Sequence, residues 1–340
     1  MTPPAPAWPL PLEILRQACA LTGDRFATAD AATHFLARVS RGERFFFAGA
    51  SLAPVFPLNP HFAGALADDK RHMADALDAA GVRVVPSTPF FADPADAARY
   101  SAGASPADAL RHADALGYPL FAKLNRGTHG RLARRIADED ALITYIAEAR
   151  AADRLFHLQP LITAPEARIF VVDGRARFLY RRERFTLTGD GKRTVGEILA
   201  GLLTDPRFAE EPTALAMTAA TLTRLAGAKH ALDDVPPPGE EIFTADAANL
   251  AQGGALDALT FQAGDAVHAW AARVAAATGL RVFGADVFYG ALDAPETFQV
   301  IEVNANPSLS GLWRAGRREE VLAIWRDILD AWFEDRTASG

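Results

Sequence analysis

The chain has 340 residues, of which 50% are hydrophobic, and its 42 acidic residues outnumber 35 lysines and arginines to give a net charge of −7. A chain of this size can bury a large core spread over two or three lobes. The acidic balance argues against a general nucleic-acid surface. No apolar run reaches the roughly 18 residues of a membrane helix, and the N-terminus lacks the pattern of a signal peptide.

The single cysteine, Cys19, lies in the apolar helical pattern LEILRQACAL. It cannot form an internal disulfide, and we expect it in the core rather than as a nucleophile. A chain with one cysteine suits a reducing compartment, so the expected location is the cytoplasm.

The sequence predicts mainly helices in the first half of the chain. Apolar residues at helical spacing predict helices over 11–21 and 30–39. Two later stretches show a helix that stops at a glycine and then a strand, namely residues 67–86 and 106–125. Another helix is expected over 138–152.

From residue 155 the pattern turns to strands. A strand is expected over 155–162, and a hairpin over 167–180 turns at Asp173 and Gly174. The remaining expected elements are helices at 194–203, 212–228, 265–280 and 317–335, a loop at 235–241, and two paired strands at 281–290 and 296–307. Helices mixed with antiparallel strands predict an α+β fold, with parallel βαβ units in the middle as the alternative.

Acid and amide side chains recur in VIEVNANPSL, residues 300–309. Successive side chains of a strand point to opposite faces, so Glu302, Asn304 and Asn306 share one face. Asp286 lies on the strand expected to pair with this one. Mg²⁺ takes oxygen ligands, typically one or two carboxylates with water and phosphate oxygens. The residues Asp286, Glu302 and Asn304 therefore suggest a metal site, although polar pairs on a solvated strand face would have the same spacing.

A lysine and glycine pattern in FAKLNRGTHGR, residues 121–131, suggests a phosphate site. Lys123 ends an apolar strand, and Gly127 and Gly130 let backbone N–H groups approach phosphate oxygens. The pattern is not that of a P-loop. An ordinary glycine-containing turn between two strands would look the same.

Two further segments carry polar residues between or after strands. Gln159 and Glu166 flank a short linker that can read an adenine edge and bind ribose, but the spacing alone favours ordinary polar residues of a loop. The run at 180–199 is cationic, with Arg181 and Arg182 on opposite faces of a strand. One of these two arginines can point inward as a clamp on an anion, the alternative being a solvated face.

The order of these segments along the chain resembles the ATP-grasp superfamily, especially the ATP-grasp modules of cyanophycin synthetases and bifunctional glutathione synthetases. Those enzymes have motifs similar to Asp69 and Lys70, to the loop at 127–131, and to GEEIFTADAANLAQGG at 239–254. The resemblance covers residues 60–315. It implies an ATP-grasp fold, in which two α+β lobes at 65–154 and 155–340 grip ATP after a short N-terminal segment at 1–64.

The resemblance also implies a role for each matching residue. The nucleotide is expected to contact Lys70, Lys123, Gly127, His129, Gly130, Arg131, Gln159 and Glu166. Two Mg²⁺ ions, with Mn²⁺ as a substitute, are expected on Asp286, Glu302 and Asn304. Arg181 and Lys123 are expected to stabilise the transferred phosphoryl group. The substrate is expected to contact Arg168, Arg182, Asn306 and Ser308.

This chain departs from the family pattern at two places. Gln159 stands where glutamate is usual, which affects the expected adenine contact. Leu132 stands where a further glycine is common, which predicts a stiffer loop.

The function implied is an ATP-dependent carboxylate–amine ligase that forms an amide through an acyl phosphate. Its substrates are expected to be amino acids or small peptides, without nucleic acid or membrane, and related enzymes are often homo-oligomers. Two alternatives remain at this stage. One is a kinase that phosphorylates a hydroxyl group, and the other is a protein that binds nucleotide without turnover.

Overall fold

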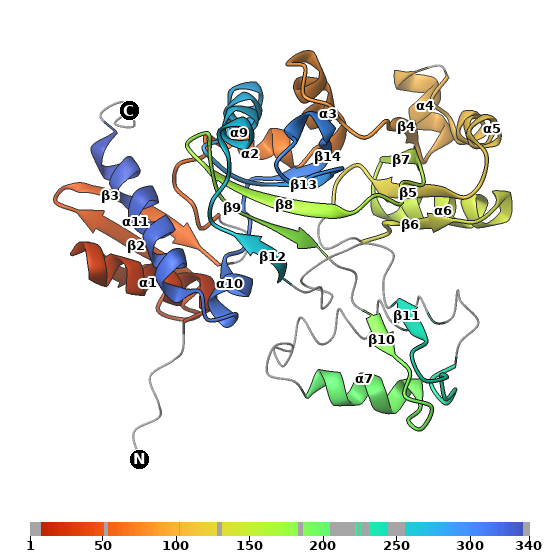
Figure 1. The fold of residues 1–340 in the computed structure, drawn as a ribbon. Helices are drawn as coiled ribbons and strands as arrows, with labels where there is room; N and C mark the ends of the chain where they lie inside the picture. Colours follow the sequence, from red (N-terminus) through yellow and green to blue (C-terminus); the bar gives the residue numbers. More distant parts are fainter. Residues whose placement is uncertain are drawn as a thin grey trace.

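The computed structural model describes residues 8–50, 54–101, 103–127, 131–182, 186–204, 231–243 and 256–335, with residues 222 and 225. Within these ranges the named strands all pair antiparallel, in four sheets, and helices pack on the sheets. Figure 1 shows a central sheet between an N-terminal unit and a second, smaller sheet. The predicted α+β class is confirmed, and the named strands form no parallel βαβ unit.

The N-terminal unit combines helix α1 (Leu10–Thr22) with a three-stranded sheet in the order β1-β2-β3. The strands of this sheet are β1 (Arg25–Thr28), β2 (Leu36–Arg41) and β3 (Arg44–Gly49). Cys19 is buried on α1, and burial raises the pKa of its thiol to about 12, which confirms that it is a core residue.

The helix predicted over 30–39 is wrong. The Asp30 side chain accepts hydrogen bonds from the backbone N–H groups of Ala32 and Thr33, which forms a turn. Strand β2 follows this turn, and its buried residues Ala37 and Val39 alternate with less buried ones. Local side-chain bonding and pairing with both neighbouring strands therefore outweigh the helical spacing.

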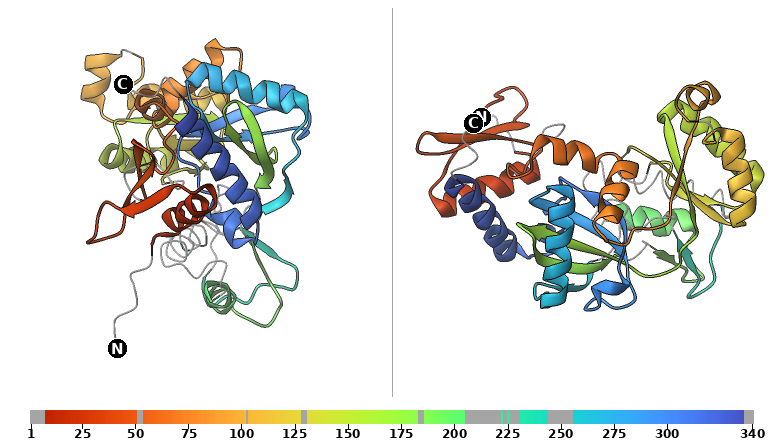
Figure 2. Two further views of the ribbon diagram at one scale, coloured as in Figure 1. Left: turned by 90° about the vertical axis from the view of Figure 1, so that its left-hand side faces the viewer. Right: turned by 90° about the horizontal axis from the view of Figure 1, so that it is seen from above.

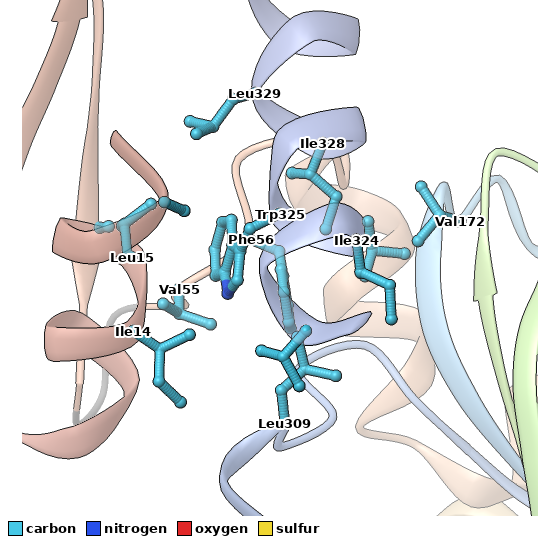
Figure 3. Packing of buried hydrophobic residues seen from close by; sticks show 14 of the residues in the cluster. Ile14, Leu15, Val55, Phe56, Val172, Leu309, Ile324, Trp325, Ile328 and Leu329 are labelled. Carbon is cyan, nitrogen blue, oxygen red and sulfur yellow. The ribbon is translucent and has the colours of Figure 1, made fainter. Parts of the chain in front are cut away.

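The last two helices of the described chain pack on this N-terminal unit. Helices α10 (Ser310–Arg314) and α11 (Arg318–Glu334) follow the central sheet, and α11 lies alongside α1 in both Figures 1 and 2. Trp325 of α11 stacks on Phe56 with 5.0 Å between ring centroids. Figure 3 shows these two rings among Val55, Leu309 and the other side chains of this core.

The helix predicted at 317–335 is present as α11, which turns an apolar stripe toward this core. Val321, Trp325 and Ile328 are buried, and Trp332 packs against the edge of the same core.

The central sheet has five strands in the order β12-β9-β8-β13-β14. They are β12 (Leu256–Thr260), β9 (Arg175–Arg182), β8 (Glu166–Val172), β13 (Val282–Phe288) and β14 (Gln299–Asn304). The predicted hairpin is present as β8 and β9, with Asp173 and Gly174 at its turn. The predicted pairing of the last two strands is present as β13 and β14, joined through the 3-10 helix η2 (Pro295–Thr297).

The two faces of the central sheet are covered by different parts of the chain. Phe170, Phe178 and Val282 on one face pack toward the N-terminal unit. Ile169 and Phe283 on the other face join the core under the helices α2 (His61–Ala67), α3 (Lys70–Ala79) and α9 (Asp265–Thr278).

The second sheet has four strands in the order β4-β7-β5-β6. They are β4 (Thr88–Phe91), β7 (Leu155–Pro160), β5 (Leu120–Leu124) and β6 (Arg134–Ile136), and the helices α4 (Pro94–Tyr100), α5 (Pro106–Leu116) and α6 (Glu139–Ala152) accompany them. Ala122, Phe156 and Leu158 face the core under α5 and α6. Side chains alternate along a strand, so Lys123 and His157 lie on the opposite face.

The strand predicted directly after Gly81 is reduced to a single bridge between Val84 and Val300, and β4 begins only at Thr88.

A smaller unit contains the strands β10 (Thr186–Thr188) and β11 (Glu241–Phe243) with helix α7 (Val195–Leu203). The helix predicted at 194–203 is confirmed, and its start is fixed by reciprocal hydrogen bonds between Thr194 and Glu197. The helix predicted at 212–228 lies outside the described residues, apart from positions 222 and 225, and so does most of the 239–254 motif.

None of the helices within the described ranges is long and apolar enough to cross a membrane.

The packing around Trp325 gives a first test. Trp325→Ala should lower the free energy of unfolding by about 3–5 kcal/mol, because it leaves a cavity beside Phe56. The measurement is urea denaturation followed by circular dichroism. Leu21→Ala on α1 is the control, since that side chain is 69% exposed. Equal losses in the two variants would contradict the packing described here.

Candidate active site

Three oxygen-bearing side chains meet on one face of the central sheet, as the alternation along β14 predicts. In the antiparallel pairing of β13 with β14, Asp286 lies opposite Glu302 and Gly284 lies opposite Asn304. The Glu302 side chain is within hydrogen-bonding reach of Asp286. The structure therefore brings together the three residues predicted as metal ligands.

Asp286 is almost completely buried and is held by two arginines. Arg168, opposite Asp286 on β8, donates from Nε to Oδ1 at 2.6 Å and from Nη2 to Oδ2 at 2.7 Å. Arg182 donates from Nη1 to Oδ2. Burial raises the pKa of the Asp286 carboxyl, but the charges of Arg168 and Arg182 outweigh it, so the pKa is lowered. Asp286 is therefore ionised at neutral pH.

A glycine allows Arg168 to lie in this position. A Cβ atom on Gly284 would come within 3.0 Å of Pro307 Cβ and 3.6 Å of Arg168 Cδ. The absence of a side chain at residue 284 thus lets the Arg168 stem and the turn at Pro307 approach the sheet closely.

Arg181 and Arg182 point to opposite faces of the sheet, and Arg182 is the one at Asp286. Arg181 lies opposite Ala167 on β8, and its Nε donates to the Tyr289 hydroxyl at 2.9 Å. Ala167 and Tyr289 both belong to the core on the other face of the sheet. The structure therefore does not bring Arg181, predicted as catalytic, to the carboxylates. The Nε of Arg182 is buried, and it has no hydrogen-bond partner among the residues that the structure describes.

Lys123 connects the two sheets. Its Nζ donates to the backbone carbonyl of Ile301 on β14 at 3.1 Å. Burial and the charge of Lys70 lower the pKa of Lys123 to about 8, against the opposite effect of Glu302 and Glu166. Lys70, Glu166 and Glu302 are therefore all close enough to the Lys123 ammonium group to change its pKa.

Lys70 starts helix α3 beside the predicted phosphate loop. Its Nζ donates to the Gly127 carbonyl at 3.0 Å. His129 and Gly130 lie outside the described residues. Arg131, the next described residue, is exposed. Leu132 has a φ of +52°, a backbone conformation that favours glycine. A leucine therefore holds this backbone conformation at a cost in local strain.

The predicted adenine and ribose residues flank the end of β7 and the start of β8. Gln159 is buried and, with His157, lies on the same face of its sheet as Lys123. Glu166 is the first residue of β8 and lies opposite Arg182.

The predicted substrate residues after β14 form local contacts. The Asn306 N–H donates to Asn304 Oδ1 at 2.8 Å, and Asn306 Oδ1 accepts from the Val55 N–H at 3.2 Å. The Ser308 hydroxyl oxygen accepts from the Ser310 N–H at 3.1 Å. These contacts fix the turn that follows the strand.

The donor set suits a hard divalent cation. Among the residues that the structure describes, no group of three or more His, Cys, Asp or Glu side chains converges on one point. The set here is two carboxylates and one amide oxygen, which matches the ligands of a Mg²⁺ ion that also binds phosphate. Asn304 Oδ1 keeps one lone pair beyond its bond from Asn306.

A buried network beside Lys123 was not predicted. His157 Nε2 is 3.0 Å from Asn125 Oδ1, and His157 Nδ1 is 2.9 Å from the Ser87 hydroxyl. The signal was present in LFHLQP, because a histidine in an apolar strand needs polar partners when it is buried.

The arrangement of strands and helices is that of the ATP-grasp fold. A bifunctional glutathione synthetase from Pasteurella multocida superimposes with a TM-score of 0.53 at 17% identity, over 89% of this chain and 41% of that one. D-alanine–D-alanine ligase from Bacillus anthracis gives a TM-score of 0.50 at 12% identity, over 83% of this chain and 72% of that one. The fold expected from the sequence is thus confirmed.

Sequence comparison finds cyanophycin synthetases. The protein from Nostoc sp. is 29% identical over 204 residues, which are 56% of this chain and 22% of that protein. The protein from Synechocystis sp. is 29% identical over 208 residues, which are 57% of this chain and 23% of that protein. The chain thus spans about a fifth of the length of these curated relatives. No protein-family profile matches the sequence.

The burial of His157 predicts a pH effect on stability. Burial, then the positive charges of Lys123, Lys70 and Arg71, lowers the pKa of His157 from 6.5 to about 3. Between these values the unfolded chain binds a proton that the folded chain does not. The free energy of unfolding should therefore decrease as pH falls through this window, by about 1.4 kcal/mol per pH unit from this residue.

Urea denaturation between pH 6.5 and 4.5 measures the effect. His157→Leu should flatten the pH dependence by that amount. Thr278→Val, a buried substitution without a titrating group, should leave the slope as in the parent chain. An unchanged slope in His157→Leu would show that this histidine is accessible to protons in the folded state.

Proposed function

We propose that this chain is an ATP-dependent carboxylate–amine ligase that joins an amino acid or small peptide to an amine through an acyl phosphate. The proposal rests on one observation above all. Asp286, Glu302 and Asn304 occupy one face of the central sheet, and Lys123 reaches that sheet from the second one. The fold that this chain shares with the glutathione synthetase and the D-alanine–D-alanine ligase also supports the proposal.

The nucleotide site that we propose lies between these groups. Lys70 and Lys123 provide two positive charges for the phosphates, and Gly127 begins the loop beside them. Gln159 and Glu166 are the proposed contacts of the adenine and ribose. Asp286, Glu302 and Asn304 would hold two Mg²⁺ ions, with Mn²⁺ as the proposed substitute, and the ions would supply positive charge that neutralises the phosphates.

We assign the binding of the substrate carboxylate to the two arginines that hold Asp286. Arg182 has a buried Nε without a hydrogen-bond partner among the described side chains and backbone groups, and Arg168 contacts the same carboxylate, Asp286. A planar guanidinium binds a carboxylate with two parallel hydrogen bonds. We therefore assign the anion-clamping role, which the sequence left open between Arg181 and Arg182, to Arg182.

The proposed reaction has two steps. A carboxylate oxygen attacks the γ-phosphorus of ATP and the bond to the ADP oxygen breaks, which leaves an acyl phosphate and ADP. The amine nitrogen then attacks the acyl carbon, inorganic phosphate leaves, and the amine proton passes to solvent. Lys123 and Arg182 contribute by orientation and by offsetting negative charge, which are the main sources of catalysis in phosphoryl transfer.

The first experiment measures Mg²⁺-dependent ADP release across a panel of amino acids and small peptides, with mass spectrometry of each mixture. We expect a product equal to two substrates minus one water. Glu302→Gln should reduce the rate by about 10²-fold or more, while Glu296→Gln on the exposed helix η2 serves as the matched control. A product heavier by one phosphoryl group would indicate a kinase. ATP binding without ADP formation would indicate a binding protein.

The two adjacent arginines provide a second test. Arg182→Lys should lower kcat/KM for the carboxylate substrate by about tenfold or more, because lysine cannot reproduce the planar contact. Arg181→Lys should change it far less, since Arg181 contacts Tyr289 on the other face of the sheet. If Arg181→Lys lowered kcat/KM more than Arg182→Lys, the carboxylate-binding role would belong to Arg181 instead.

A further inference from the structure

A buried hydrogen-bond network joins the start of helix α3 to the end of strand β5. Asn125, two residues after Lys123, accepts through its backbone carbonyl from the Lys70 N–H at 3.3 Å. Its side-chain Oδ1 accepts from the Arg71 N–H at 3.0 Å. Asn125 thus satisfies two of the free N–H groups in the first turn of α3, and the Asp69 side chain accepts from His72 as the helix cap.

The Arg71 N–H determines the orientation of the Asn125 amide. A backbone N–H can only donate, so the atom that it meets must be the amide oxygen. The Asn125 nitrogen is thereby directed elsewhere, and a hydrogen bond from the Asn125 side chain contributes to the lowered pKa of buried Asp69. The amide of Asn125 consequently contacts both the helix start and its capping carboxylate.

His157 fixes this amide from the opposite side. Its Nε2 faces the Asn125 oxygen, which can only accept, so Nε2 carries the proton. Its Nδ1 then accepts from the Ser87 hydroxyl. The ring is 2% exposed and has a partner on each nitrogen, so its position is determined by Ser87 and Asn125 together.

Two lysines of the proposed phosphate site depend on this network. Lys123 lies directly opposite His157 in the pairing of β5 with β7. Lys70 is the first residue of α3, and its Nζ contacts Gly127, two residues after Asn125. The helix start, the strand end and the first glycine of the loop are therefore held by the same few hydrogen bonds.

We propose that His157 is a positioning residue which, through Asn125, holds Lys70 and Lys123 at the separation needed to bind the phosphates of one nucleotide. This inference rests on the proposed function, because it takes the two lysines as phosphate contacts. It assigns no chemical step to His157. Loss of its hydrogen bond frees the Asn125 amide to rotate, which removes the partner of the Arg71 N–H and loosens the start of α3.

The test compares nucleotides that differ only in their phosphates. Displacement of a fluorescent ATP analogue by ATP, ADP and adenosine is measured with the full chain and Mg²⁺. The variants are His157→Leu, Asn125→Ala, the double variant and His157→Gln, whose amide N–H can still donate to Asn125. Thr278→Val is the control for a buried polar substitution away from the lysines. Circular dichroism confirms that each variant is folded.

Removal of the network should weaken ATP binding by about fivefold to tenfold while adenosine binding changes by less than about twofold. The double variant should lose little more than the worse single variant, and His157→Gln should recover part of the loss. The control should change neither affinity. A merely structural role would weaken ATP and adenosine alike, and that result, or unchanged ATP binding in folded His157→Leu and His157→Gln, would overturn the inference.

These affinities, taken with the ADP-release and mass-spectrometry assay described above, separate this inference from the proposed function. A parent chain that binds ATP but forms no amide with any substrate would count against the ligase, and the ratio of ATP to adenosine affinity would still decide the role of His157. A parent chain without affinity for ATP would overturn both.

Discussion

The buried carboxylate of Asp286 constrains much of the architecture around it. An ionised group with 1% exposure is tolerated only when charged partners replace its water. Here Arg168 does so from the adjacent strand β8, and Arg182 does so from β9, one strand further along the sheet. The two arginines must therefore lie on the same side of the sheet as Asp286. This requirement also divides one face of the central sheet into an ionic end and an apolar end, where Phe170 and Phe178 pack toward the N-terminal unit.

The contact of Lys123 with the Ile301 carbonyl complements this arrangement. It brings a positive charge from the second sheet to the strand that carries Glu302, while Lys70 approaches from the start of α3. Neither sheet alone contains the whole cluster. The candidate site is therefore a property of how the two sheets face each other, and residues far apart in the sequence contribute single groups to it.

Strand periodicity was sufficient to predict part of the site. The alternation along 300–309 correctly placed Glu302 and Asn304 on one face, and the turn at Asp173 and Gly174 correctly predicted the hairpin. The choice between Arg181 and Arg182 depended on the register with β8, which is a long-range property and cannot be read from a local run of arginines. The wrong helix at 30–39 had a similar cause, since a side-chain turn at Asp30 and pairing with two strands outweighed helical spacing. The roles of the individual site residues and the division into lobes at residue 154 stay predictions.

The position of helix α11 has a consequence for how the chain is made. Phe56 and its neighbours near the N-terminus find their stacking partner in Trp325, which is separated from them by the whole of both large sheets. During synthesis the N-terminal unit emerges first, yet its apolar surface stays uncovered until residues 318–334 have left the ribosome. This core can therefore be completed only after both large sheets have been synthesised, and until then its apolar residues are open to contacts with other molecules.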